Sequence, residues 1–393
     1  MKKSAILLSF LLLILTACGA DPKPVETIRV VEEEEIRKGM YQEVEYLERM
    51  PQVTQIAPFM PENAISGCFC ANGDTVFYLA YFGDYLLDQE TGNNKEFEPQ
   101  YNTQIWAYDK ESGSCALIYQ YDEDWCVEIS DMVCDESTLV WEDYGDEGWR
   151  LQAMPLDGSA SPEIIISKAD MNSDIWSVTP AVCGNRVYWY DSKAGEEGFS
   201  AYEYDLTSGT LTRLQEGIAG TPYEHISVMN RMLTFCETAE DIYRLQFRNM
   251  DTGDSLLLET TVPVLNPISN GRVCAWRTSY DSDKRLYVYD HKADTMEWIE
   301  LPKDVLEKEG DFFSYAVLDR MVIVNYRGSS LSRVGRLLCY DIETKTYTEL
   351  AAVDENGTLM YTFQDSESRV SLEMSLEQDD FQVLEIFYDS EQN

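Results

Sequence analysis

Three arginines lie close together in a chain that is otherwise strongly acidic. Arg327, Arg333 and Arg336 fall within ten residues, whereas the whole chain has 30 Lys and Arg against 71 Asp and Glu. A guanidinium group is planar and can form paired hydrogen bonds with a carboxylate or a phosphate. The spacing therefore predicts a loop that binds an acidic glycan or an acidic protein segment. The alternative is that the arginines pair with acidic residues of neighbouring loops.

Aromatic side chains that recur at roughly matching places form a second candidate set. Aromatic rings suit the faces of sugars and apolar peptide side chains. The alternative is that these rings pack as core between adjacent structural repeats. The set consists of Trp125, Trp176, Tyr223, His225, Phe313 and Tyr361.

Known catalytic motifs are not complete anywhere in the sequence. Gly253–Leu256 spells the opening block of one family of serine hydrolases, but that family also needs a late Asp-x-x-His. Neither histidine of the chain, His225 or His291, has an aspartate three residues before it. No nucleophile elbow, phosphate loop, dinucleotide fingerprint or zinc-ligand spacing occurs. We therefore expect no catalysis, no cofactor and no metal, although paired carboxylates for glycoside chemistry stay open in so acidic a chain.

The elements that would position these side chains come from a repeated unit, best seen in residues 186–215. Arg-Val-Tyr-Trp-Tyr-Asp is followed by a polar loop, a Tyr-Glu-Tyr-Asp-Leu run, a Thr-Ser-Gly turn and a third alternating run. Runs rich in β-branched and aromatic residues, separated by turn residues, predict antiparallel strands. The aspartate before the turn is expected to accept hydrogen bonds from backbone N–H groups two residues on.

The same closing aspartate recurs seven times. Successive marks lie 48, 48, 46, 39, 51 and 48 residues apart, at Asp109, Asp157, Asp205, Asp251, Asp290, Asp341 and Asp389. A period of about 40 to 50 residues with about four strands each is typical of a β-propeller. We predict an all-β, seven-bladed propeller of four-stranded antiparallel blades, with six or eight blades as alternatives. Loops between blades and loops joining second to third strands would share one face, which would carry both candidate sets.

These blade motifs carry a resemblance. The Arg-Val-Tyr-Trp-Tyr strand, the Tyr-Glu-Tyr-Asp-Leu strand and the Thr-Ser-Gly turn resemble the blades of TolB-like and DUF5050 (low-density-lipoprotein-receptor-like) propellers of bacterial lipoproteins, over about residues 65–393. The resemblance implies the architecture and, for TolB-like domains, protein partners. It does not imply an activity, because propellers host binding, scaffolding and catalysis alike.

The N-terminus reads as an export signal. Lys2-Lys3, the apolar run from Ala5 and the ending Leu15-Thr16-Ala17-Cys18 resemble a bacterial lipoprotein signal, which implies that Cys18 is lipidated after removal of residues 1–17. An ordinary secretory signal is the alternative. Residues 18–40, with two prolines and a run of glutamates, are predicted to be a tether. Residues 41–393 would form the propeller, with 41–53 as the strand that closes the ring because the last repeat ends without an outer strand.

Composition sets the remaining expectations. The net charge of −41 disfavours nucleic acid and anionic membrane as direct partners. The cysteines other than Cys18 are expected to be buried free thiols. We thus predict a monomeric, extracytoplasmic lipoprotein, anchored by lipid to a bacterial membrane, that binds or scaffolds a protein or glycan ligand. The alternatives are a propeller enzyme acting on carbohydrate or peptide in the central channel, and an assembly factor of an envelope complex.

Overall fold

The computed structural model describes most of the chain after residue 24. The described residues are 25–62, 64–82, 103–121, 129–145, 147–196, 198–218, 226–229, 231–239, 242–278, 285–300, 312–327, 335–352, 357–366, 369–376 and 381–388. Within these ranges no helix is long and apolar enough to cross a membrane.

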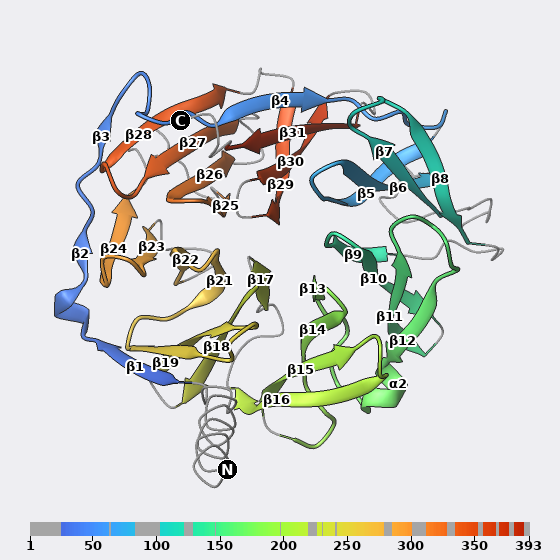
Figure 1. Cartoon of the computed structure of the whole chain (residues 1–393), viewed down its shortest axis with the longest axis horizontal. Helices are drawn as coiled ribbons and strands as arrows, with labels where there is room; N and C mark the ends of the chain where they lie inside the picture. Colours follow the sequence, from blue (N-terminus) through green and yellow to red (C-terminus); the bar gives the residue numbers. More distant parts are fainter. Residues whose placement is uncertain are drawn as a thin grey trace, which may run out of the picture.

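The described strands form seven sheets arranged around a common centre, as Figure 1 shows. From the centre outward, the first four sheets are β5 (Ala64–Ala71), β6 (Thr75–Phe82), β7 (Gln104–Asp109), β8 (Cys115–Gln120); β9 (Ile129–Cys134), β10 (Thr138–Gly145), β11 (Gly148–Pro155), β12 (Glu163–Ser167); β13 (Ala181–Cys183), β14 (Arg186–Asp191), β15 (Phe199–Asp205), β16 (Thr210–Ile218); and β17 (Ser227–Met229), β18 (Met232–Ala239), β19 (Ile242–Asn249), β20 (Ser255–Thr260). Within each sheet these neighbours pair antiparallel.

The last three sheets complete the circle. They are β21 (Leu265–Ser269), β22 (Val273–Arg277), β23 (Arg285–Asp290), β24 (Thr295–Glu300); β25 (Phe312–Leu318), β26 (Met321–Arg327), β27 (Gly335–Asp341), β28 (Thr346–Ala352); and β29 (Gly357–Ser366), β30 (Arg369–Leu376), β31 (Phe381–Phe387), β4 (Gln52–Ile56). The one described α-helix is the short α2 (Lys168–Met171), between the second and third sheets. The prediction of an all-β fold built from four-stranded antiparallel sheets is therefore confirmed.

The hydrophobic core lies between neighbouring sheets. Leu79 of the first sheet packs in one cluster with Met132 and Trp141 of the second, and Val288 of the fifth packs with Val322 of the sixth. The repeat is visible in the largest side chains. The fourth residue of the second strand is a fully buried tryptophan in three sheets, Trp141, Trp189 and Trp276.

The aspartate turns form as the sequence predicts in several repeats, but two of the marks need correction. In the third sheet, Asp205 Oδ1 accepts the N–H groups of Thr207 and Ser208 at 3.0 and 2.9 Å. In the fourth sheet the residue at this place is Asn249, which accepts the N–H groups of Asp251 and Thr252. An asparagine amide oxygen makes the same turn as a carboxylate. The predicted mark, Asp251, was therefore placed two residues after the residue that forms the turn.

The second sheet shows the same displacement. There Pro155 ends β11 where five other sheets have an aspartate or asparagine, because Thr138 pairs with Pro155 as Arg186 pairs with Asp205. Asp157 lies two residues beyond, in a turn of its own, and accepts the Ser159 N–H at 2.9 Å. The seventh mark, Asp389, lies outside the described residues.

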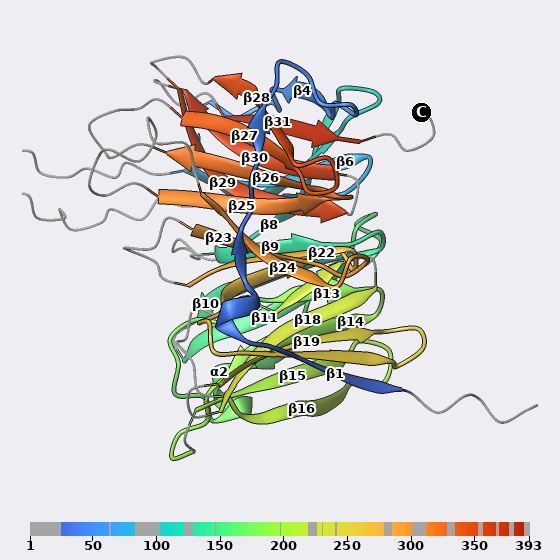
Figure 2. The ribbon, with the colours of Figure 1, turned by 90° about the vertical axis from the view of Figure 1, so that its left-hand side faces the viewer.

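The segment before β4 differs from the predicted tether. β1 (Glu26–Val31), β2 (Arg37–Lys38) and β3 (Gln42–Glu43) pair in parallel with the outermost strands β20, β24 and β28, with the 3-10 turn η1 (Glu33–Glu35) between the first two. We call residues 25–51 the strap; it runs along the rim of the ring (Figure 2). Its backbone groups satisfy sheet edges that would otherwise be open, and Val31 is buried.

The outer strand of the seventh sheet is β4. It pairs antiparallel with β31, from Gln52 with Phe387 to Ile56 with Val383. The predicted segment, 41–53, overlaps β4 at two residues, whereas its first part, β3, lies on the sixth sheet. The seven described cysteines, in β5, β8, β9, β13, β18, β22 and β27, are free thiols.

Candidate functional site

Two faces of the ring carry the connections between strands, at opposite ends of the strands (Figure 2). One face carries the loops between the second and third strands and the segments that join neighbouring sheets, and we call it the loop face. The turn face carries the first-to-second and third-to-fourth-strand turns, such as the Asp205 turn. The sequence predicts that both ligand-binding sets lie on the loop face.

Few side chains of these sets fall among the described residues. Trp125, Tyr223, His225 and Arg333, like the predicted lipidation site Cys18, lie outside them. Phe313 is in β25 and Arg327 in β26, where their backbones pair with Tyr326 and Phe312, and Tyr361 is in β29. For Phe313, Arg327 and Tyr361 only the backbone is described. The side chains that can be judged are Arg336 and Trp176.

Arg336 is engaged within its own sheet. Its Nε and Nη2 atoms both donate to Glu349 Oε2, at 2.8 and 2.6 Å. Glu349 is on the neighbouring strand β28. This is pairing with an acidic neighbour, the alternative that the sequence left open for the arginines.

Trp176 is displayed on the loop face. It follows α2, in the segment that leads into β13, and 78% of its surface is exposed. Its ring stacks on Tyr144, near the end of β10, with ring centroids 6.0 Å apart and ring planes 27° apart. The Lys168 ammonium lies 5.9 Å from the ring centroid. Tyr144 therefore backs the exposed tryptophan ring, and a cation lies over that ring.

The segment that carries Trp176 is held on both sides. Lys168 Nζ donates to the carbonyl of Ile175 at 2.7 Å. Val178 N–H donates to Glu142 Oε1 and Ser177 Oγ to Glu142 Oε2, each at 2.8 Å. The side chains of Ile175 and Val178 are buried in the cluster between the second and third sheets. Trp176 is therefore an exposed ring on a fixed backbone.

A second buried carboxylate secures the start of this segment. Asp191, at the end of β14, accepts a 2.6 Å hydrogen bond from Ser173 Oγ. The same hydroxyl oxygen accepts the Ile175 N–H and the Trp149 indole N–H, both at 3.3 Å. Burial raises the pKa of Asp191 to about 6, against the hydrogen bond from Ser173.

Glu142 is the central anchor and was not found from the sequence. It is fully buried, and it also accepts a hydrogen bond from Ser130 Oγ. Burial raises the pKa of its carboxyl to about 7. Its cross-strand partner Asp131 has its pKa raised to about 7 by burial and then by the Glu142 charge. Asp131 keeps some contact with solvent, whereas Glu142 has none.

The available signal for Glu142 was its place in the repeat. It follows Trp141 in a strand whose equivalents have Tyr190 after Trp189 and Arg277 after Trp276. A charged residue next to a core tryptophan needs an internal partner. The sequence could not show that this partner is the backbone next to Trp176.

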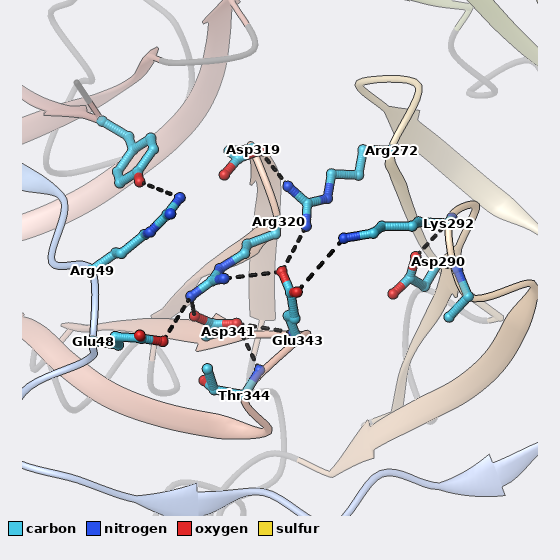
Figure 3. Close-up of polar contacts among 12 residues, drawn as sticks. Glu48, Arg49, Arg272, Asp290, Lys292, Asp319, Arg320, Asp341, Glu343 and Thr344 are labelled. Atoms are coloured by element: carbon cyan, nitrogen blue, oxygen red, sulfur yellow. Dashed lines mark hydrogen bonds and ion pairs between the residues drawn. The ribbon is translucent and has the colours of Figure 1, made fainter. Parts of the chain in front are cut away.

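The turn face carries a network of charged groups, shown in Figure 3. Arg320 Nη2 pairs with Asp341 at 2.6 Å and its Nη1 with Glu343 at 2.9 Å, and Glu48 of the strap lies 3.6 Å from Arg320. Arg272 pairs with Glu343 at 2.8 Å. The cations and carboxylates of this network pair with one another across two sheets and the strap. We therefore interpret the network as a structural contact between these elements and not as a ligand site.

Metal binding has no support in the part of the chain that the structure describes. There, no group of three or more His, Cys, Asp or Glu side chains could hold a metal ion.

The sequence matches no protein family, and no curated protein matches it either. Solved structures with similar folds do exist. The β-propeller domain of the Trilobed protease from Pyrococcus furiosus, described as having an open velcro topology, has a TM-score of 0.54 and 11% identity, covering 84% of this chain and 94% of that chain. A prolyl endopeptidase has a TM-score of 0.51 and 11% identity, covering 82% of this chain and 46% of that one.

TolB from Acinetobacter baumannii is also similar, with a TM-score of 0.40 and 12% identity, covering 75% of this chain and 78% of that chain. At 11% identity, the two similarities with TM-scores above 0.5 establish the fold alone. The protein is a β-propeller, and its function must be argued from its own side chains.

Proposed function

We propose that the protein is an extracytoplasmic, lipid-anchored β-propeller that binds a protein or glycan ligand on its loop face and does not transform it. In this proposal each of the seven described sheets is one blade, and the chain is a relative of the TolB-like and DUF5050 propellers of bacterial lipoproteins. The observation that carries the proposal is Trp176, an exposed aromatic ring on a backbone fixed by Glu142 and Lys168.

An exposed tryptophan on a fixed loop favours binding. Tryptophan is prominent among residues that dominate binding energies. A fixed backbone reduces the conformational entropy lost when the ligand docks. Burying such a ring stabilises a complex by roughly 25 cal/mol for each Å² of apolar surface removed from water.

The buried carboxyls support binding rather than catalysis. Both oxygens of Glu142 accept hydrogen bonds from the segment beside Trp176, and the side chain has no exposed surface. A general acid or base must come within hydrogen-bonding distance of the substrate. Glu142 is instead committed to holding the loop.

The position of the strap favours outward display of this site. Val25 N–H donates to Asp254 Oδ1 at 2.8 Å, and Val25 accepts the Ser255 N–H at 2.9 Å. Asp254 precedes β20 in a turn-face turn. An anchor at Cys18 would join the ring at that side, which leaves the loop face turned away from the membrane.

The test is quantitative capture from native membranes by crosslinking. The wild-type protein is compared with Trp176→Ala and with Tyr46→Ala, a matched control because Tyr46 is an aromatic residue of the strap with 69% of its surface exposed. We expect capture of a defined ligand to fall about tenfold or more with Trp176→Ala and to persist with Tyr46→Ala. Equal capture by all three proteins would contradict a loop-face site at Trp176.

A further inference from the structure

The loop face offers a flat aromatic surface with a polar surround. Tyr144 stacks against the Trp176 ring with ring planes 27° apart, so it backs the tryptophan, and 78% of the Trp176 surface stays exposed as a flat apolar plane. The apolar C–H face of a pyranose ring packs against such a plane, while the sugar hydroxyls point outward to water and polar side chains.

The surroundings of Trp176 are polar. Among the described residues of 142–148 and 168–180, Trp176 is the sole large apolar side chain that is exposed. The Lys168 ammonium lies over the ring, 5.9 Å from its centroid, and Asp174, two residues before Trp176, is exposed. The core of a protein–protein interface is depleted in charge and contains several apolar or aromatic side chains packed together. A single flat ring within polar groups suits a sugar better than a protein partner.

The electrostatics disfavour a strongly anionic glycan here. The chain carries a net charge of −41, which repels a polyanion at long range. Within the described ranges, the cation over the ring is Lys168, and it already donates a hydrogen bond to the carbonyl of Ile175. The arginine-bearing strands β26 and β27 lie in another sheet, across the ring from α2 (Figure 1). The acidic ligand predicted for the three arginines therefore concerns another part of the ring and not the site at Trp176.

We propose that Trp176, backed by Tyr144, is a stacking subsite for a sugar ring of an uncharged glycan. This inference rests on the proposed binding function and specifies its ligand class. The subsite contributes through ring stacking and needs no ion pair with the ligand. Glu142 acts as a positioning residue, because it holds the backbone of Ser177 and Val178 and does not reach the surface.

The experiment is calorimetric titration of the full mature chain with oligomers of β-1,4-linked glucose, xylose and N-acetylglucosamine, and with oligogalacturonate as a charged comparator. We expect at least one uncharged oligomer to bind, with little change between low and high salt. Trp176→Ala should weaken that binding about tenfold or more, the size expected from loss of an aromatic contact of about 1.4 kcal/mol. Trp176→Phe should retain part of the affinity, and Tyr46→Ala all of it.

Three results would overturn the inference: no binding of any uncharged oligomer, equal binding by Trp176→Ala, or binding of oligogalacturonate alone. Because Trp176 is exposed, its substitution should leave the melting temperature unchanged, which separates lost binding from lost folding. If membrane capture still depends on Trp176 while no glycan binds, the ligand is a protein. In that case the proposed function stands and the glycan inference fails.

Discussion

The Glu142 carboxylate of β10 lies 2.8 Å from the backbone nitrogen of Val178, in the segment that leads to the next sheet. This contact joins a buried charge in one sheet to the connection that displays Trp176. Because the carboxylate also accepts the Ser177 hydroxyl, it fixes the two residues that follow the ring. The position of the Trp176 ring on the loop face thus depends on a residue that has no exposed surface.

Glu142→Gln should loosen this segment. One amide oxygen can replace one carboxylate oxygen, but the NH₂ group would then face the donors Ser177 and Ser130. We expect the Val178 amide hydrogen to exchange about tenfold or more faster with solvent, while core amides of β14 keep their rates. Hydrogen exchange resolved by peptide checks this, with Glu111→Gln as a control at an exposed turn. Unchanged exchange at Val178 would mean that Glu142 does not hold the loop.

The same carboxyl should make stability depend on pH. Burial raises the pKa of Glu142 from its usual 4.5 to about 7, so the folded state binds this proton more tightly than the unfolded state. Its contribution is fully present below about pH 4.5 and is lost as pH rises through about 7. Asp191, with a pKa of about 6, acts in the same direction.

The melting temperature of the wild type should therefore fall between pH 5 and pH 8, and Glu142→Gln should fall less steeply because the amide does not titrate. Thermal unfolding across this range checks the slope, with Glu111→Gln again as the control. Burial lowers the pKa of His291 to about 4, so this residue acts in the opposite direction below about pH 6.5 in both proteins. The comparison of slopes therefore decides, and equal slopes for wild type and Glu142→Gln would refute the assignment.

The first and last sheets are joined by an ion pair that is nearly buried. Lys110, after β7, pairs with Glu385 of β31 and also donates to the carbonyl of Asn72 at 2.8 Å. Lys110→Met leaves the Glu385 carboxylate with its cation removed, at an expected cost of about 3–5 kcal/mol. The double substitution Lys110→Met with Glu385→Leu should recover much of that loss, because no unpaired charge remains. Denaturant unfolding of the two variants and the wild type checks this order of stabilities.

The fold could be predicted from the sequence because each strand carries its own signal. Alternating apolar and aromatic residues, with turn residues between them, recur often enough to give the strands, their grouping in fours and the period. The strap could not be predicted in this way. Arg37–Lys38 and Gln42–Glu43 are two-residue strands of exposed polar residues, so their sequence has no strand pattern. The contacts of Lys38 with Glu300 and of Glu43 with Tyr347 follow from the fold and leave no local signal.

The sequence could predict which residue types belong to the site, but not which of them are exposed. Trp176 could be selected as one aromatic residue among several, yet whether its ring lies in the core or at the surface depended on the segment around it. Glu142 was one carboxylate among 71 acidic residues. Its role appears only when the fold brings residues 142 and 178 together, because a hydrogen bond over that separation leaves no local pattern.

Lipidation at Cys18 has a direct test. Cys18→Ala should leave the protein unprocessed or released from the membrane, because stable anchoring depends on the acyl chains. Detergent phase partitioning and the apparent mass of the product check this. A variant that partitions as the wild type does would contradict the lipoprotein signal and, with it, the proposed location.

The two parts of the N-terminal region should differ in their importance for stability. β1, β2 and β3 add to sheets that already have four strands, whereas β4 supplies the fourth strand of a sheet that otherwise has three. Deletion of residues 25–43 removes edge pairing and the buried Val31. Deletion of residues 44–56 also opens the edge of β31 along its five paired residues and removes the buried Leu47 from the core between the sixth and seventh sheets.

We expect both deletions to lower the melting temperature, the second by several degrees more than the first, because it interrupts the ring itself. Calorimetry of the two truncated proteins decides the point, and a larger loss from the first deletion would show that the strap, rather than β4, holds the ring closed.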